Sequence, residues 1–194
     1  MKKIKPCIII GEVKRVRKVK VILLFFLLCI SIEGCKSQMS WRERLMKEFG
    51  SEDEIADQMM EDIVAALDAR DADALRALFS EVALEEATDI DQQISDLLMF
   101  YEGKVESFKG LNSSSNDIEH GKNVKKQIIG HYKLTTDKET YRVMYDYNVI
   151  DKENPNEVGL SQLEILTDEI YQRDDFNYLS GSEGYEGPGV YIQK

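Results

Sequence analysis

The stretch "NVKKQIIGHYKLTTDKETYRVMYDYNVI", residues 123–150, decides the predicted fold. Its two halves are rich in β-branched and aromatic residues, which are enriched in β-strands. The polar pair Asp137 and Lys138 separates the halves at a turn. We therefore expect two strands joined by a short connection, and strands joined in this way pair antiparallel.

Further strands are expected on both sides of this pair. The run "KVESFKGL", residues 104–111, alternates in polarity, and "VGLSQLEILTDEIY", residues 158–171, follows a polar loop. Three or four consecutive strands without intervening helices predict an antiparallel meander. After Asp174 the glycine-rich tail is expected to be mostly irregular, and only "GVYIQ", residues 189–193, could add a last strand.

The residues before these strands show a helical period. Ser51 and Glu54 form a capping-box pattern, which is typical of a helix start. The apolar face of this helix is formed by Ile55, Met59, Ile63, Val64 and Leu67. The helical pattern breaks at Asp71 and restarts, and a third helical pattern ends at Gly103. The predicted fold class is α+β, with N-terminal helices packed on one face of an antiparallel β-sheet.

Near the N-terminus, a basic flank precedes an apolar run of twelve residues, 21–32. A bilayer-spanning helix needs about 20 such residues, whereas the core of a signal peptide needs about 7–15. A buried helix is the alternative, but the run lacks the polar face of an ordinary core helix. The basic flank stays on the cytoplasmic side, so we expect everything after the run to be exported.

The run ends in "IEGC", residues 32–35, which resembles the lipobox of bacterial lipoproteins, with Glu33 as a departure from the usual pattern. The resemblance implies a signal peptide over residues 1–34 and lipidation of Cys35. The mature protein would then be anchored by lipid at the extracytoplasmic face of the cell membrane. Cys35 would be its only thiol, because Cys7 and Cys29 lie in the leader. A free thiol or an intermolecular disulfide at Cys35 is the alternative.

Residues 35–50 are expected to form a lipidated tether and a short helix, followed by one domain over residues 51–194. The helix would carry Trp41, Leu45 and Phe49 on one stripe. Packing of this stripe against the domain is favoured over a second contact with the membrane, because such stripes are usually core.

Net charge excludes one class of partner. Loss of residues 1–34 removes eight of the 25 basic and two of the 36 acidic residues, which leaves 17 and 34 and a net charge of about −17. Association with nucleic acids and anionic lipid headgroups is driven by Lys and Arg. We therefore expect no nucleic-acid partner.

The segment "IVAALDARDADALRALFSEVAL", residues 63–84, resembles the opening helices of the nuclear-transport-factor-2-like (cystatin-like) superfold, which precede a curved sheet. Together with the lipobox and "FYEGKVESFKG", residues 100–110, the chain is similar to a family of bacterial lipoproteins, domain of unknown function 5104. The resemblance covers nearly the whole mature chain and implies this fold, but the family brings no established catalytic residues.

Some members of that superfold use a pocket Asp with Tyr or His to move protons beside a carbonyl. The candidates here are Asp146, Tyr145, Tyr141 and His131. Strand alternation places Tyr141 and Tyr145 on one face of the sheet and Asp146 on the other, unless a bulge intervenes. Tyrosines that alternate with valine are also the ordinary content of a half-buried strand.

Other chemistries lack their motifs, so we expect no cofactor and no metal site. The two histidines, His120 and His131, belong to no zinc-binding pattern, and no phosphate-binding loop or serine-nucleophile motif occurs. The sequence thus predicts a non-catalytic, lipid-anchored cell-envelope protein that binds a small ligand or another envelope protein. The alternative is an isomerase- or cyclase-like acid/base enzyme that uses the conical pocket of the superfold. Converging polar groups in that pocket would favour the enzyme, and an aromatic and aliphatic filling would favour the binding role.

Overall fold

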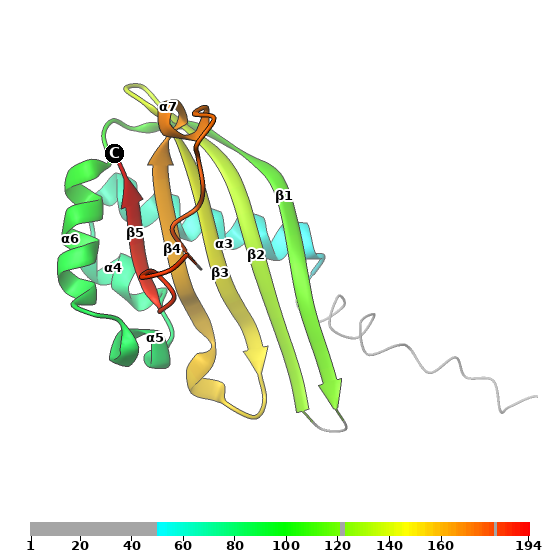
Figure 1. The fold of residues 1–194 in the computed structure, drawn as a ribbon. Helices are drawn as coiled ribbons and strands as arrows, with labels where there is room; N and C mark the ends of the chain where they lie inside the picture. The colour runs from blue at the N-terminus through cyan, green and yellow to red at the C-terminus, as the bar shows by residue number, and fades with distance from the viewer. Residues whose placement is uncertain (1–49, 121–122, 181) are drawn as a thin grey trace, which may run out of the picture. The chain divides into compact units, whose positions relative to one another are not determined.

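The computed structural model describes residues 50–120, 123–180 and 182–194 (Figure 1). The predicted signal peptide, the lipidation at Cys35 and the predicted helix around residues 41–49 lie outside the described residues. Within the described part of the chain, every helix is too short or too polar to cross a membrane.

The residues before the sheet form the helices α3 (Glu52–Ala69), α4 (Ala72–Ala77), α5 (Glu81–Glu86) and α6 (Ile90–Phe100), which confirms the predicted helical first half. The capping box is present, because the Ser51 hydroxyl accepts the Glu54 N–H at 3.2 Å and the Ser51 N–H donates to the Glu54 carboxylate at 2.7 Å. Asp71 caps α4 by accepting the Ala74 N–H at 2.9 Å. The predicted break at Asp71 is therefore the start of a new helix.

The sheet consists of β1 (Val105–His120), β2 (Asn123–Thr136), β3 (Thr140–Asp151), β4 (Gly159–Thr167) and β5 (Gly189–Gln193), in that spatial order. The first four strands pair antiparallel, as the meander prediction required. The last strand, β5, pairs parallel with β4. The described sheet is thus open and mostly antiparallel.

Two predicted strand boundaries were wrong. The strand predicted from residues 104–111 ended at Leu111. In the structure β1 continues to His120, because the polar residues after Leu111 pair with β2 and contact α3. Ser113 and Ser115 each donate a 2.6 Å hydrogen bond, to Asp53 and Glu52 respectively. Residues 168–171, predicted as strand, instead form the short helix α7 (Asp168–Tyr171), because the Thr167 side chain accepts the Ile170 N–H.

One face of the sheet, here called the helix face, is crossed by α3 (Figure 1). The Tyr145 ring packs there over Gly130, where an added Cβ would lie 2.3 Å from a ring carbon, and it stacks on Tyr132. The Tyr145 hydroxyl donates to the Ala56 carbonyl of α3 at 2.6 Å. These contacts fix the position of α3 on the sheet.

The opposite face is crossed by the C-terminal segment, defined here as residues 172–180 and 182–188, which lies between α7 and β5 in the chain (Figure 1). Glu164 of β4 is fully buried beneath it. Its carboxylate accepts the N–H groups of Leu179 and Ser180 at 2.9 and 3.0 Å and the Ser180 hydroxyl at 2.8 Å. Gln193 of β5 donates to the same carboxylate at 2.7 Å. Glu164 thus joins the C-terminal segment and β5 to the sheet.

Candidate functional site

The space between α3 and the sheet is where a conical pocket was expected, and side chains fill it. Tyr145 and Met60 are fully buried there, and Tyr132 is 2% exposed. Further side chains of this core cluster are Ile63, Leu67, Ile128, Leu134, Val143, Leu163 and Ile165. The filling is therefore aromatic and aliphatic.

Two of the four proton-transfer candidates point into this core. The Tyr145 hydroxyl is bonded to Ala56, and the Tyr141 hydroxyl accepts the Glu102 N–H at 2.8 Å. Burial raises the pKa of both phenols. Both hydroxyls therefore stay neutral near pH 7 and are engaged by backbone groups.

The other two candidates lie on the face of the C-terminal segment. Asp146 pairs with Gln162, whose amide donates to the Gly187 carbonyl of that segment at 2.8 Å. The register shift between β3 and β4 lies beyond Asp146, so the predicted alternation places Asp146 and Tyr145 on opposite faces. Burial raises the pKa of the Asp146 carboxyl.

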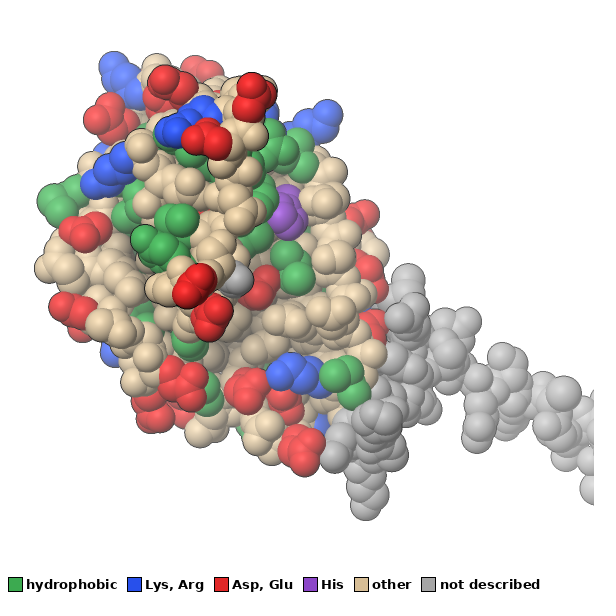
Figure 2. Space-filling model, in the orientation of Figure 1, with side chains coloured by type: hydrophobic (Ala, Val, Ile, Leu, Met, Phe, Trp, Pro, Cys, Tyr) green, Lys and Arg blue, Asp and Glu red, His purple; other side chains and the backbone are tan. Residues whose placement is uncertain are grey.

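His131 lies in the row of side chains next to Asp146, because His131 pairs with Met144. Its Nδ1 lies 3.3 Å from the Tyr178 hydroxyl, and burial lowers the pKa of its imidazole. Few charged side chains lie on the surface between the C-terminal segment and β1, where hydrophobic side chains and a histidine are visible (Figure 2). The structure therefore brings His131 and Asp146 to one face and separates them from Tyr141 and Tyr145.

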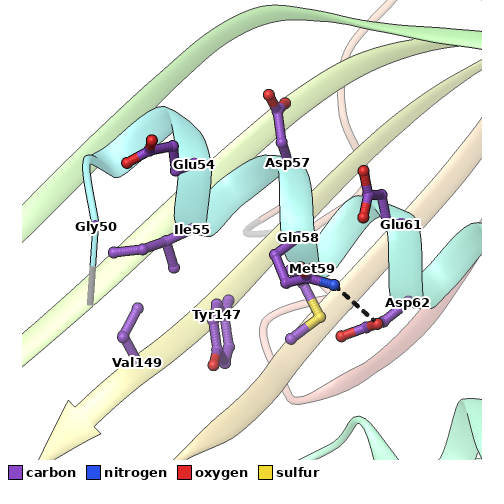
Figure 3. A pocket seen from close by; sticks show the side chains of 10 residues that line it. All are labelled: Gly50, Glu54, Ile55, Asp57, Gln58, Met59, Glu61, Asp62, Tyr147 and Val149. Carbon is purple, nitrogen blue, oxygen red and sulfur yellow. Dashed lines mark hydrogen bonds between the residues drawn. The ribbon is translucent and has the colours of Figure 1, made fainter. Parts of the chain in front are cut away.

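A groove of about 600 Å³ opens at the edge of this core, between the first half of α3 and the end of β3 (Figure 3). Its lining consists of Gly50, Glu54, Ile55, Asp57, Gln58, Met59, Glu61, Asp62, Tyr147 and Val149. Ile55 and Met59 extend from α3 toward Tyr147 and Val149 of β3. The floor of the groove is thus apolar and is built by two elements that are distant in sequence.

The rim of the groove is acidic. Glu54, Asp57, Glu61 and Asp62 are exposed, and the described residues that line the groove include no Lys or Arg. Hydrogen bonds from the backbone and then the hydroxyl of Ser51 lower the pKa of the Glu54 carboxyl. Figure 3 shows that Asp62 extends on the same side of α3 as the apolar floor, whereas Asp57 and Glu61 point away from it.

The rim carboxylates differ in how they are held. Asp57 accepts the Tyr132 hydroxyl at 2.8 Å, and Asp62 accepts the Gln58 amide at 3.3 Å. Glu61 makes no hydrogen bond or ion pair within the described part of the chain. The pKa of Tyr147 is raised by burial and then by the charge of Asp62. Within the described residues, the Glu61 carboxylate thus retains free hydrogen-bonding capacity, and so does the second oxygen of each of the other three rim carboxylates.

Sequence reasoning did not identify this groove. The acids at positions 54, 57, 61 and 62 recur at helical spacing and are visible in the sequence, but such a row is usually a solvated helix face. Only the tertiary fold places β3 beside them. For a metal, residues 50–120, 123–180 and 182–194 contain no group of three or more His, Cys, Asp or Glu side chains that could hold an ion.

Comparison with protein families gives a match. The model of the family described as Domain of unknown function (DUF5104) matches residues 62–168, which is more than half of the chain. This range includes Asp62 and Tyr147 of the groove and all four proton-transfer candidates, whereas Glu54, Asp57 and Glu61 precede it. No curated protein matches the chain.

Proposed function

This chain belongs to the family described as Domain of unknown function (DUF5104), and we propose that it is a non-catalytic binding protein of the bacterial cell envelope. The domain binds a small ligand or another envelope protein, and a lipid on Cys35 holds it to the membrane. The family description assigns no reaction, so the proposal rests on the residues of this chain.

The observation that carries the binding role is the filled space between α3 and the sheet. Acid/base catalysis needs a cavity in which a base and a proton donor reach the same substrate atom. Here Tyr145 is fully buried and bonded to Ala56, and Asp146 lies on the other face of the sheet. A concave surface between α3 and β3, the groove of about 600 Å³, is available instead. We therefore do not propose the isomerase- or cyclase-like alternative.

For the fold, we propose the nuclear-transport-factor-2-like superfold. The order of elements supports it, because a long helix, a break capped by Asp71 and further helices precede the antiparallel strands. In that superfold the binding surface lies between the helices and the sheet. Side chains fill this space in the present domain, so the ligand binds in the groove instead.

The proposed location rests on the leader sequence. The basic flank, the apolar run of twelve residues and "IEGC" together are typical of an exported lipoprotein. Two acyl chains suffice for stable attachment, since burial contributes about 0.8 kcal/mol per CH₂ and a single chain binds only marginally.

Replacement of Cys35 by Ser tests the location. We expect an unprocessed precursor, or a shed form if another peptidase cuts, because the variant lacks the thiol that accepts the lipid. Mass spectrometry of the wild-type membrane fraction should show a chain that begins at Cys35 and carries added acyl mass. A membrane-bound wild-type protein that retains residues 1–34 without acyl mass would contradict the proposal and indicate an uncleaved signal anchor.

A further inference from the structure

We propose that the sheet surface beside the C-terminal segment binds an uncharged saccharide at Asp146 and Asn148 of β3. This site lies on the opposite face of the sheet from the groove, so the inference goes beyond the binding role proposed for the groove. Two polar side chains without partners among the described residues carry it, one half-buried and one buried.

Asp146 and Asn148 point to the same face of β3. Tyr147 and Val149 line the groove beneath α3 (Figure 3), so the residues that alternate with them point to the other face. Two positions along a strand span roughly 7 Å. The two side chains therefore lie close enough to contact one small ligand.

The amide oxygen of Asn148 is a buried acceptor without a donor. Asn148 is 5% exposed, and its Oδ1 has no hydrogen-bond partner in the described part of the chain. Buried polar atoms in proteins are almost always hydrogen-bonded, because an unpaired one costs free energy. The terminal torsion of an Asn side chain is broad, so a small rotation turns this oxygen toward a ligand. A ligand that donates a hydrogen bond here removes the cost.

The Asp146 carboxylate is a second acceptor of this kind. It is half-buried and makes no hydrogen bond or ion pair with a described residue. Burial raises the pKa of this carboxyl. Lys125 of β2 does not compensate it, because Lys125 is held by Asp151 at 3.3 Å and Glu157 at 2.8 Å. Both oxygens of Asp146 are therefore free to accept hydrogen bonds from a ligand.

The neighbours of these acceptors favour a ligand with several hydroxyl groups. On β2, Gln127 pairs with Asn148. On β4, Gln162 pairs with Asp146, and its amide nitrogen donates to the Gly187 carbonyl at 2.8 Å. An amide thus lies beside each acceptor, and amides both donate and accept, as sugar hydroxyls do. A sugar ring with neighbouring hydroxyls can bond several of these groups at once.

The apolar face of a sugar ring finds partners at the same place. Ile129 pairs with Asp146, and His131 follows Ile129 on the same face of β2. The His131 imidazole packs edge-to-face against Tyr178, with ring centroids 5.3 Å apart. Small-ligand sites combine such apolar and aromatic side chains with a few polar groups.

Charged ligands fit this site less well. Anions are repelled by the Asp146 carboxylate. A calcium ion takes about six to eight oxygens, whereas the described residues contain no group of three or more His, Cys, Asp or Glu side chains that could hold an ion. Burial disfavours the charged form of the Asp146 carboxyl, and the amides beside it pair with neutral groups.

Nuclear magnetic resonance titration of the isotope-labelled full-length chain tests the proposal. The detergent is a polyoxyethylene ether, because a detergent with a sugar headgroup would compete. The probes are cellotriose, maltotriose, mannotriose and triacetylchitotriose. For at least one probe we expect saturable shifts at the backbone amides of Gln127, Asp146 and Gln162, with an affinity that added salt does not change. Equal affinity for the matching monosaccharide would support a free sugar as the ligand, and weaker affinity would support a glycan chain.

The variant Asp146→Asn keeps the size of the side chain and removes its charge. It should bind the probe about tenfold more weakly, equivalent to ~1.4 kcal/mol. Its urea midpoint should not fall, because the carboxylate has no partner among the described residues to lose. This second readout separates a binding residue from a structural one. If Asp146→Asn does not fold, Asn148→Ala replaces it, with the same expected loss of affinity.

The matched control is Asp62→Asn, which makes the same charge change at the groove. We expect its affinity for the probe to equal that of the wild type. Loss of binding in Asp62→Asn with normal binding by Asp146→Asn would overturn this inference and place the saccharide in the groove, where the broader binding role would survive. Absence of shifts with every neutral probe would also overturn it. So would binding of glucosamine alone, because its ammonium group would indicate a cationic ligand.

Discussion

Replacement of Glu164 by Ala should destabilise the domain strongly and release the C-terminal segment. The carboxylate is fully buried and accepts four hydrogen bonds, from two backbone N–H groups, one hydroxyl and one amide. A hydrogen bond to a charged group contributes about 1.5–3 kcal/mol, and a buried donor left unpaired costs about 1–3 kcal/mol. Leu179 and Ser180 are half-buried, so water can reach part of the released donors.

We therefore expect the free energy of unfolding to fall by about 3–5 kcal/mol, because several donors lose their acceptor at once. With an m-value of about 1–3 kcal/mol/M, the urea midpoint should fall by roughly 2 M. Glu164→Gln keeps the shape and one acceptor oxygen, so its loss should be smaller. Hydrogen exchange at the amides of Leu179 and Ser180 should accelerate in Glu164→Ala. A midpoint within about 0.3 M of the wild type, with unchanged exchange at these amides, would refute the assigned role of Glu164.

Two further predictions concern the two faces of the sheet. Gly130→Ala should lower the free energy of unfolding, measured by urea denaturation, by about 1–3 kcal/mol, because the added Cβ meets the Tyr145 ring. An added Cβ at Gly187 has no atom within 4 Å, so Gly187→Ala should stay within about 0.5 kcal/mol of the wild type. Equal effects of the two substitutions would contradict the packing of Tyr145 over Gly130. Burial lowers the pKa of His131 below the ordinary histidine value of about 6.5. Its contribution to stability is therefore present above that pH and is lost as pH falls toward the pKa of the folded state. The variant His131→Gln should therefore lose less stability than the wild type between about pH 7 and pH 5, and identical pH profiles would argue against a buried imidazole.

Local sequence patterns predicted the parts of the fold that local forces determine. The capping box at Ser51 and the break at Asp71 are short-range hydrogen bonds, and both lie where the sequence placed them. Alternation along β3 correctly separated the face of Tyr145 from that of Asp146. Each of these features depends on residues within a few positions of one another.

The features that were missed depend on contacts between distant residues. The second half of β1 has a low intrinsic preference for strand, and Ser113 and Ser115 are held by acids about 60 residues earlier in the chain. The groove likewise joins Asp62 on α3 to Tyr147 on β3. Nothing in the sequence indicates that Asp62 and Tyr147 lie close together. The site could therefore be found only once the fold was known.

The polar second half of β1 also bears on aggregation. The strand lies at one end of the sheet order, and within the described residues no strand pairs with its outer side. Such an edge can add strands from other molecules, and flat hydrophobic edges do so most readily. Here "NSSSND", residues 112–117, lacks the β-branched and aromatic residues that favour intermolecular pairing. The polar composition because of which the second half of β1 was not predicted thus also discourages fibril growth when many copies are crowded together.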